Sequence, residues 1–525
     1  MGDDWTVEDR AQLDEHGITT AELDRQLTLF KKPRNYTTLV RACTLEDGIV
    51  QLAEDAIPGL HALQHEAATD GRFLKFVPAS GAASRMFGML LHFLKGPGSE
   101  ACWPDVLQEA ESGGVEAACL LTFIRDLDRF AFRQDLGEVL GKDVDPATMQ
   151  EAGSFRKILK ALLGPDGLNY EQLPKGLLKF HDYPEGSRTP FEEHLVEAAH
   201  HINAGSGNCR LHFTVSPEHK PLFIRLFKQV QALYQERLGA TFDASYSEQK
   251  KSTDTLAVDL ENRPLRDDAG HLMFRPGGHG ALLDNLDDLQ ADLVYIKNID
   301  NVQPDRLKQT TLDWKRTLGG YLVQTQQQVH ESLERLTKKR KKKAGTERSE
   351  RELNEVSRRL VTGLNGDRSG TSAGLRREFL INRLNRPIRV CGVVKNTGEP
   401  GGGPFWVRGA DGATTLQIVE GIEVDPDDTE QQRILRSSTH FNPVDLVCAV
   451  RDAKAKNYDL ERFVNPEASI ITTKRSGGQK LRALERPGLW NGGMAGWNTV
   501  FVEVPIETFT PVKTVLDLLR NIHQP

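Results

Sequence analysis

The chain has 525 residues, of which 38% are hydrophobic and 27% charged, and its formal net charge is -7 at pH 7. This length exceeds what one small core fills, and the acidic balance argues against a nucleic-acid binder. The six cysteines are scattered without a Cys-x-x-Cys pair, which argues against a zinc motif or a secreted disulfide framework. We see no signal peptide and no run near the ~18 apolar residues of a membrane helix, so we expect a cytoplasmic protein without a membrane partner.

Residues 1–70 carry apolar side chains spaced by three and four, a period that predicts a helical N-terminal region. The first strand is expected over 73–80, where "FLKFVPAS" ends in small residues. Charged helical patterns with Gly and Pro punctuation follow over about 97–170 and indicate an insertion. Further strands are expected at 209–219, 240–249 and 291–300, with helical stretches between them. Strands that alternate with helices predict an α/β fold with a mostly parallel central sheet, whose ligands bind at the carboxyl ends of the strands.

Residues 310–385 differ in composition and predict a long charged helical hairpin with a basic turn, "KKRKKK", at 338–343. This run is a possible nuclear or RNA-binding signal, but in an acidic chain we favour a solvated helix end and expect no nucleic-acid partner. A β-rich pattern returns from 386 and continues to residue 525. The sequence therefore predicts four parts, at 1–70, 71–309, 310–385 and 386–525.

The first strand opens into "PASGAASRM", a stretch of small residues. Small side chains let a ligand approach the backbone, and the N-terminus of a following helix offers N–H groups to an anion. Arg85 adds a fixed cation for phosphate oxygens. A tight strand-to-helix turn that needs small residues for packing is the alternative. The candidate phosphate-binding residues are Ser80, Gly81, Ala82, Ala83 and Arg85.

A second glycine cluster, "RPGGHGALL", precedes a helical pattern. A planar base could lie against the bare backbone of Gly277, Gly278 and Gly280, and His279 could contact a base or a ribose. The alternative is a turn with a capping histidine. The following strand ends in "NIDN", where Asp300 is placed to bind Mg²⁺, a hard cation that prefers oxygen ligands. An Asx-turn that closes the strand is the alternative for Asp300.

The C-terminal third is rich in polar and glycine clusters. Three consecutive glycines, Gly402 among them, lie beside Glu399 and suit a loop that contacts hydroxyl groups. Glu420 and Asn491 are further candidates for sugar hydroxyls. Lys513, between Pro-Val and a helical "TVLDLL", could project towards phosphate, although an exposed surface lysine is the alternative.

Together these stretches resemble a known family, the UDP-sugar pyrophosphorylases. "RPGGHGALL" with "VYIKNIDNV" resembles the turn that contacts uridine and the strand end that holds the metal in those enzymes. "PASGAASRM" is similar to the activation loop of sugar nucleotidyltransferases, "LPKGLLKFHDYPEG" resembles the Pro-Lys segment that follows it, and "FTPVKTVLDLL" the C-terminal Pro-Val-Lys segment. The resemblance covers roughly 70–300 and 386–520. As a whole the chain is most similar to an uncharacterised bacterial family of unknown function within this superfamily.

The resemblance implies a glycosyltransferase-A-like, Rossmann-type three-layer α/β/α sandwich with helical insertions. It implies an Mg²⁺-dependent reaction in which a nucleoside triphosphate, with UTP favoured, and a sugar 1-phosphate give an NDP-sugar and pyrophosphate. It also implies that 71–309 binds the nucleotide and 386–525 the sugar phosphate. Roles carried over by the resemblance fall on Lys175 for the α-phosphate and Lys513 for the sugar phosphate. "THFNPVDLV" resembles the family more loosely, and it adds Asn442 for the sugar and Asp445 for the metal.

The sequence also departs from the family pattern. Ser80 and Ala83 replace two glycines of the usual loop, Ser84 replaces a threonine, and a large segment separates Arg85 from Lys175. A glycosyltransferase of the same fold and a non-catalytic nucleotide-binding or interaction protein therefore stay open. Glycosyltransferases typically use an Asp-x-Asp metal motif, and "NIDN" has only one of these carboxylates.

Overall fold

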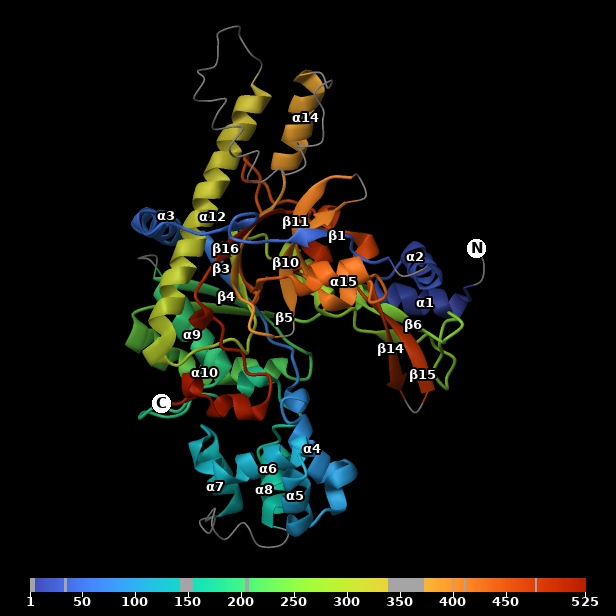
Figure 1. Ribbon diagram of the computed structural model, residues 1–525, viewed down its shortest axis with the longest axis vertical. Coiled ribbons are helices and arrows are strands. Elements are labelled where there is room, and N and C mark those ends of the chain that lie inside the picture. The colour runs from blue at the N-terminus through green and yellow to red at the C-terminus, as the bar shows by residue number, and fades with distance from the viewer. Residues whose placement is uncertain are drawn as a thin grey trace. The chain divides into compact units, whose positions relative to one another are not determined.

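A computed structural model describes residues 5–32, 35–141, 154–203, 207–338, 373–399, 401–409, 412–476 and 479–525. The chain forms two compact units (Figure 1). The first unit comprises Met1–Phe76, Ser247–Ile296 and Lys315–Ile506, and the second comprises Val77–Tyr246, Lys297–Trp314 and Glu507–Pro525. The chain enters each unit three times, so neither unit is one continuous stretch of sequence. The predicted four-part division stays a prediction.

The first unit is built on a mixed, mostly parallel sheet, which confirms the α/β fold class. β16 pairs in parallel with β2 and β9, β8 pairs in parallel with β3, and β13 lies antiparallel to β9. β12 also pairs with β9. The strand order is β2 (Ile49–Val50), β16 (Asn498–Glu503), β9 (Ile388–Lys395), β13 (Asp445–Ala449), β8 (Leu293–Lys297) and β3 (Phe73–Pro78), with β12 at His440–Phe441.

Two antiparallel sheets complete the strands of the first unit. One has the order β1 (Leu39–Ala42), β10 (Gly402–Arg408), β11 (Thr414–Glu420). The other has the order β14 (Ile470–Ser476), β15 (Gln479–Glu485), β6 (Thr255–Val258), β7 (Phe274–Arg275). β1 and β2 lie in the N-terminal region, for which the sequence predicts only helices. The two strands are missed because each pairs with a strand more than 300 residues away, and local periodicity does not report such a contact.

The helices of the N-terminal region are α1 (Val7–His16), α2 (Thr20–Lys31) and α3 (Ile57–Thr69), and those further along the first unit are α11 (Leu282–Asp288), α14 (Ala373–Leu384) and α15 (Thr429–Arg436). α12 (Lys308–Thr337) begins in the second unit and belongs to the first unit from Lys315. α12 and α14 lie at the two ends of the predicted charged hairpin. The basic run at 338–343 lies outside the described residues after Lys338. Of the helices that the structure describes, none has the length and apolar character to cross a membrane.

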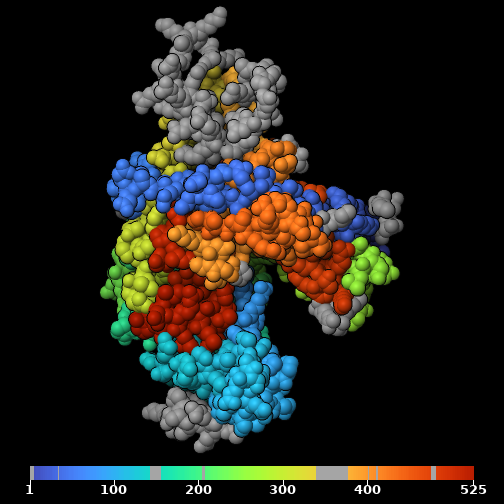
Figure 2. Space-filling model, in the orientation of Figure 1, coloured from blue at the N-terminus to red at the C-terminus, as the bar shows by residue number. Residues whose placement is uncertain are grey.

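The second unit contains the predicted helical insertion. Phenylalanines and leucines from its helices share one buried core with Val512 and Val515 near the C-terminus. In Figure 2 the helices close into one continuous surface, coloured blue to cyan. Residues 142–153 of the insertion lie outside the described part. The elements are α4 (Gly88–Lys95), α5 (Trp103–Glu111), α6 (Val115–Arg125), α7 (Arg133–Leu140), α8 (Ser154–Leu163), α9 (Pro190–His201), β4 (Asn208–Thr214), α10 (Lys220–Leu238) and β5 (Thr241–Ser247).

Close packing of α12 against α3 gives a test of the fold. A Cβ added at Gly320 would lie 1.9 Å from the Leu60 carbonyl oxygen, so Gly320→Ala forces two helix backbones apart. We expect a loss of about 1–3 kcal/mol or more in the free energy of unfolding, measured with urea. Gly59→Ala is the matched control, because its Cβ meets nothing within 4 Å, and it should gain up to about 1 kcal/mol. Equal stability of the two variants would contradict this packing.

Candidate active site

The first candidate loop follows β3 and packs against the segment that carries Lys175. Ala82 and Pro174 form an antiparallel bridge, and the Lys175 N–H donates to the Gly81 carbonyl at 3.1 Å. The Ala83 N–H donates to the Leu173 carbonyl at 3.1 Å and is therefore not available to an anion. Only one 3-10 turn, Ala83–Arg85, follows the loop, and α4 begins at Gly88. The expected row of free N–H groups at a helix start is thus shorter than the sequence suggests.

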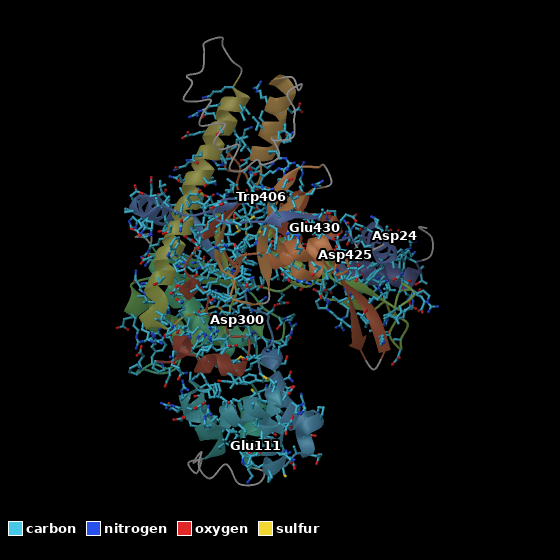
Figure 3. All side chains as sticks on the ribbon, viewed as in Figure 1. Asp24, Glu111, Asp300, Trp406, Asp425 and Glu430 are labelled. Carbon is cyan, nitrogen blue, oxygen red and sulfur yellow. The ribbon has the colours of Figure 1, made fainter. Side chains whose placement is uncertain are left out.

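Lys175 connects this loop to the metal candidate Asp300. Its Nζ donates to Asp300 Oδ2 at 2.8 Å and to the Val512 carbonyl at 2.6 Å. Both charged side chains are only 12% exposed. The ion pair therefore lies in a partly buried position, where charges are screened less than on the surface. Asp300 is labelled in Figure 3.

Asp300 is held in turn by the C-terminal segment. The Val512 N–H donates to the Asp300 carbonyl at 3.1 Å, and the Thr510 N–H donates to Asn301 Oδ1 at 2.9 Å. Asn301 and Pro511 form an antiparallel bridge. Four separate segments, at 81–83, 173–175, 300–301 and 510–513, thus meet in the second unit.

Two further predicted cations belong to the same unit. Arg85 and Lys513 are exposed, and neither side chain bonds an acceptor within the described residues. The Met86 carbonyl accepts from the Val515 N–H at 3.1 Å, which ties the segment of Arg85 to the segment of Lys513. Arg85 and Thr514 line one cavity of about 530 Å³. The structure therefore brings Arg85, Lys175, Asp300 and Lys513 into one unit, with two cations left for an anionic ligand.

Asp300 fits one part of a magnesium site. Mg²⁺ at nucleotide sites is bound by one or two carboxylates, with waters and substrate phosphates as its other ligands. Across the described residues, no group of three or more His, Cys, Asp or Glu side chains could hold a metal ion. Asp445, the second predicted ligand, places its Oδ1 2.7 Å from Lys315 Nζ in the first unit, and both side chains are buried. Its carboxylate is neutralised there, and its role as a metal ligand stays a prediction.

The Gly-Gly-His-Gly turn lies in the first unit, and its glycines have structural causes. A Cβ at Gly277 would lie 2.4 Å from the Thr253 carbonyl oxygen, and a Cβ at Gly280 would lie 2.2 Å from the Pro487 carbonyl oxygen. Gly278 has a φ of 77°, a backbone conformation that residues with a side chain rarely adopt. Close backbone packing and a left-handed turn are thus sufficient reasons for the three glycines.

His279, the side chain within this turn, has a buried ring nitrogen that the fold does not use. Its ring stacks on Trp490 with centroids 4.5 Å apart, and its Nε2 is buried without a hydrogen-bond partner in the described structure. Burial lowers the pKa of His279 below its usual value, against the opposing charges of Glu420 and Glu485. A neutral ring with one unused nitrogen suits a polar group of a ligand.

Asn491 lies beside the same space. A Cβ at Gly488 would lie 2.5 Å from His279 Nε2 and 3.4 Å from Asn491 Oδ1, which is also buried without a partner in the described structure. Asn491 Nδ2 donates to Glu423 Oε2 at 2.7 Å and to Glu420 Oε1 at 3.4 Å. Three predicted residues, His279, Glu420 and Asn491, therefore meet, and Glu423 is a partner that the sequence analysis missed.

The other residues predicted to contact the sugar lie in three different settings. Gly402 is the cross-strand partner of Glu420 at the β10–β11 edge, while Glu399 is partly buried in the loop after β9. Asn442 uses both ends of its side chain within the fold, since Nδ2 donates to the Gly392 carbonyl at 2.9 Å and Oδ1 accepts from the Val444 N–H at 3.1 Å. A structural role is therefore sufficient to explain Asn442.

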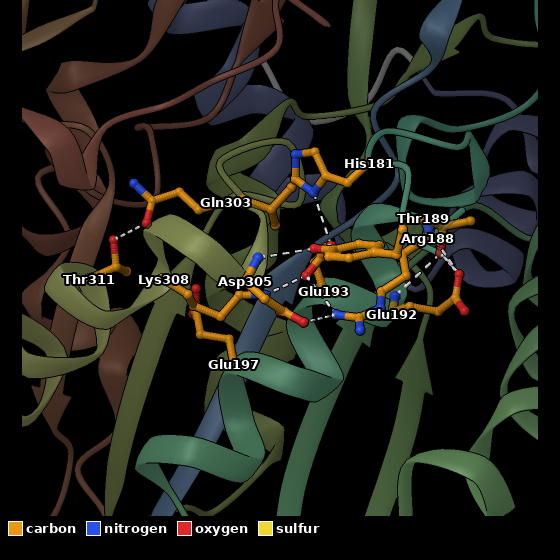
Figure 4. Close-up of polar contacts among 12 residues, drawn as sticks. His181, Arg188, Thr189, Glu192, Glu193, Glu197, Gln303, Asp305, Lys308 and Thr311 are labelled. Carbon is orange, nitrogen blue, oxygen red and sulfur yellow. Dashed lines mark hydrogen bonds and ion pairs between the residues drawn. The ribbon is translucent and has the colours of Figure 1, made fainter. Parts of the chain in front are cut away.

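A buried polar network that the sequence analysis missed anchors the segment after Asp300 (Figure 4). Glu193 on α9 accepts from His181 at 2.9 Å and pairs with Lys308, while Arg188 bonds Asp305 at 2.8 Å. Burial alone would raise the pKa of Glu193, but Lys308 and His181 hold it well below its usual range. The sequence signal is "PFEEHLVEAAHH", a helix whose three glutamates, His194 and His201 are buried with its apolar residues.

Comparison with known proteins assigns the chain to a family. Residues 6–524 match the family DUF4301, a domain of unknown function. The chain belongs to the DUF4301 family. No curated protein sequence matches it.

Solved structures similar to this DUF4301 protein include UDP-sugar pyrophosphorylases. The UDP-N-acetylglucosamine pyrophosphorylase of Trypanosoma brucei, in complex with an inhibitor, is 13% identical over 99% of this chain and 80% of that chain, with a TM-score of 0.48. A UDP-glucose pyrophosphorylase variant of Leishmania major, in complex with UDP-glucose, is 12% identical over 98% and 79%, with a TM-score of 0.47. The UDP-glucose phosphorylase of Trypanosoma brucei is 12% identical over 98% and 77%, with a TM-score of 0.43. At these identities, what those enzymes bind is not transferred to this chain.

Close packing at Gly488 gives a test of the turn in this DUF4301 protein. Gly488→Ala would place a methyl group 2.5 Å from His279 Nε2, and we expect a loss of about 1–3 kcal/mol in the free energy of unfolding, measured with urea. Gly421→Ala is the control, because its Cβ would make only an ordinary 3.6 Å contact with Leu435. Equal stability of Gly488→Ala and the wild type would contradict this packing of His279.

The C-terminal histidine predicts a pH dependence of stability. Burial, with the charges of His181 and Arg520, lowers the pKa of His523 to about 3. As the pH falls below ~6.5, His523 therefore takes up a proton in the unfolded chain before it does so in the folded chain. The stability that neutral His523 contributes is present above that pH and is lost between ~6.5 and 3. We expect His523→Gln to remove up to about 1.4 kcal/mol per pH unit from the slope of unfolding free energy between pH 6 and 4. An unchanged slope in urea titrations would contradict this assignment.

Proposed function

We propose that this DUF4301 protein is a sugar-1-phosphate nucleotidylyltransferase that forms an NDP-sugar and pyrophosphate from a nucleoside triphosphate and a sugar 1-phosphate. The observation that carries the proposal is the convergence of Lys175, Asp300 and the Val512 carbonyl, with the exposed cations Arg85 and Lys513 on the attached segments. A nucleoside triphosphate and a sugar phosphate together bring several negative charges to one reaction centre. Three basic side chains and one carboxylate for a divalent cation suit that demand.

The reaction needs no covalent intermediate with the protein. A phosphate oxygen of the sugar 1-phosphate attacks the α-phosphorus in line, a new P–O bond forms, and the bond to the β-phosphate oxygen breaks to release pyrophosphate. Positioning and charge neutralisation then supply the catalysis. When bound to Asp300, Mg²⁺ supplies charge neutralisation for the phosphate oxygens.

Each basic residue has a proposed task. Arg85, exposed after the first loop, binds the β- and γ-phosphates as a guanidinium that can bond two oxygens at once. Lys175, fixed by its backbone bond to Gly81 and by the Val512 carbonyl, offsets charge at the α-phosphate. Lys513, next to Val512 in the chain, holds the phosphate of the sugar.

The residues predicted to contact the base and the sugar belong to the first unit, and their roles stay predictions from the sequence. His279 and the backbone of Gly278 are the predicted contacts of the base, for which the resemblance favours uracil. Glu420 and Asn491, which are hydrogen-bonded to each other, are the predicted contacts of sugar hydroxyls. Glu399 and Gly402 are the remaining predicted contacts of the sugar.

Pyrophosphate release tests the proposal. We expect release with Mg²⁺ from at least one pair in a panel of nucleoside triphosphates and sugar 1-phosphates. Asp300→Asn should lower kcat/KM about 100-fold or more, because it removes the one carboxylate for the cation. Lys513→Met should raise the KM for the sugar phosphate more than the KM for the nucleotide.

Lys228→Met is the matched control, since Lys228 is an exposed lysine on α10 of the same unit and has no acid partner among the described residues. Its kcat/KM should equal that of the wild type. Absence of pyrophosphate release from every pair would remove the proposed activity, and full activity in Asp300→Asn would remove the proposed cation site.

A further inference from the structure

The carboxylate proposed to hold the divalent cation already bonds a lysine. Lys175 Nζ lies 2.8 Å from Asp300 Oδ2, and only 12% of either side chain is exposed. Within the described residues, Lys175 is the one side chain that bonds this carboxylate. The same carboxylate therefore has two competing uses, an ion pair within the fold and a bond to a metal ion.

An ammonium group and Mg²⁺ do not share such a carboxylate easily. Mg²⁺ requires oxygen ligands at about 2.0–2.1 Å in a near-octahedral arrangement. A lysine ammonium is a donor only and cannot become one of those ligands. At the separation set by one carboxylate the two cations repel each other, and partial burial leaves that repulsion poorly screened. A metal ion on Asp300 thus requires either movement of Nζ or an anion that offsets both charges.

The contacts of Lys175 show where its ammonium can go. The Lys175 backbone is fixed by the bond from its N–H to the Gly81 carbonyl, and Nζ also bonds the Val512 carbonyl at 2.6 Å. Val512 directly precedes Lys513, the proposed ligand of the sugar phosphate. A small rotation of the flexible side chain can therefore exchange Asp300 for a phosphate oxygen while the bond to Val512 is kept.

We propose that Lys175 and the divalent cation compete for the Asp300 carboxylate, so that the cation binds tightly only together with a phosphate-bearing substrate. The phosphate supplies Lys175 with a new acceptor and supplies the metal with further oxygen ligands. The proposed function provides the identity of the metal and of the substrate, and the inference rests on it for these two points. Free Mg²⁺ is then a poor ligand, and the metal–nucleotide complex is the species that the protein selects.

Binding of Mn²⁺ alone, followed by the electron paramagnetic resonance signal of the free ion, tests the competition without turnover. The wild type should show no Mn²⁺ site that depends on Asp300. Lys175→Met should gain one site with at least tenfold higher affinity, and the double variant Lys175→Met/Asp300→Asn should lose it. Lys179→Met is the matched control, because Lys179 pairs with Asp135 at 3.0 Å in the same unit and makes the same change of charge.

Lys175→Gln guards against loss of folding in the methionine variant. Glutamine lacks the charge but keeps hydrogen-bond donors for Asp300 and the Val512 carbonyl, so it should also bind Mn²⁺ at least tenfold more tightly than the wild type. Adding Mn²⁺ should raise the UTP affinity of the wild type at least tenfold, and this coupling should be smaller in both variants because binding coupling is reciprocal.

Two results would overturn the inference. One is a folded Lys175→Met or Lys175→Gln protein that binds Mn²⁺ no more tightly than the wild type. The other is a wild type that already holds one Mn²⁺ and loses it in Asp300→Asn. Failure of the proposed function is a separate result, seen as absence of pyrophosphate release while the Mn²⁺ site still appears on loss of Lys175.

Discussion

The two bonds donated by Lys175 Nζ, to Asp300 Oδ2 and to the Val512 carbonyl, are the contacts on which the charged centre of the second unit depends. They join the segment that carries Lys175, a strand end after β8 and the C-terminal segment, three stretches that are remote in the sequence. Such a partly buried ion pair contributes little net stability compared with apolar packing, and losing one partner leaves the other uncompensated. Its value lies in fixing three chain segments in one place, where substrate phosphates would find preset cations.

The strand ends of this centre could be read from the sequence, and its bonds could not. Asp300 follows an apolar strand, and small residues follow β3, so the rule that ligands bind at strand ends selects both positions. Lys175 was found by resemblance alone, because an isolated lysine has no local signal. Lys513 was also a candidate from its place between Pro-Val and a helical pattern. The Val512 carbonyl was missed, since every residue has one. The same limit explains Asp445, whose buried partner Lys315 is 130 residues away.

The Gly-Gly-His-Gly turn shows how a motif can have two sufficient causes. Gly277 and Gly280 are required by nearby backbone carbonyls, so the fold alone would select glycine there. His279 is different. Its Nε2 is buried without a hydrogen-bond partner in the described structure, which costs free energy. Stacking on Trp490 alone would not require a polar ring at this position. The unused Nε2 of His279 and Oδ1 of Asn491 are therefore more informative about function than the three glycines.

The discontinuous course of the chain has a consequence for biosynthesis. The second unit collects residues 77–246, 297–314 and 507–525, so its last part leaves the ribosome after almost the whole first unit. Until then Lys175 lacks the Val512 carbonyl, and the core of the helical insertion lacks Val512, Val515 and Leu518. Contacts of such long range form slowly, and an incomplete apolar core is prone to aggregation. A nascent chain would thus hold an open second unit until residues 507–525 are made.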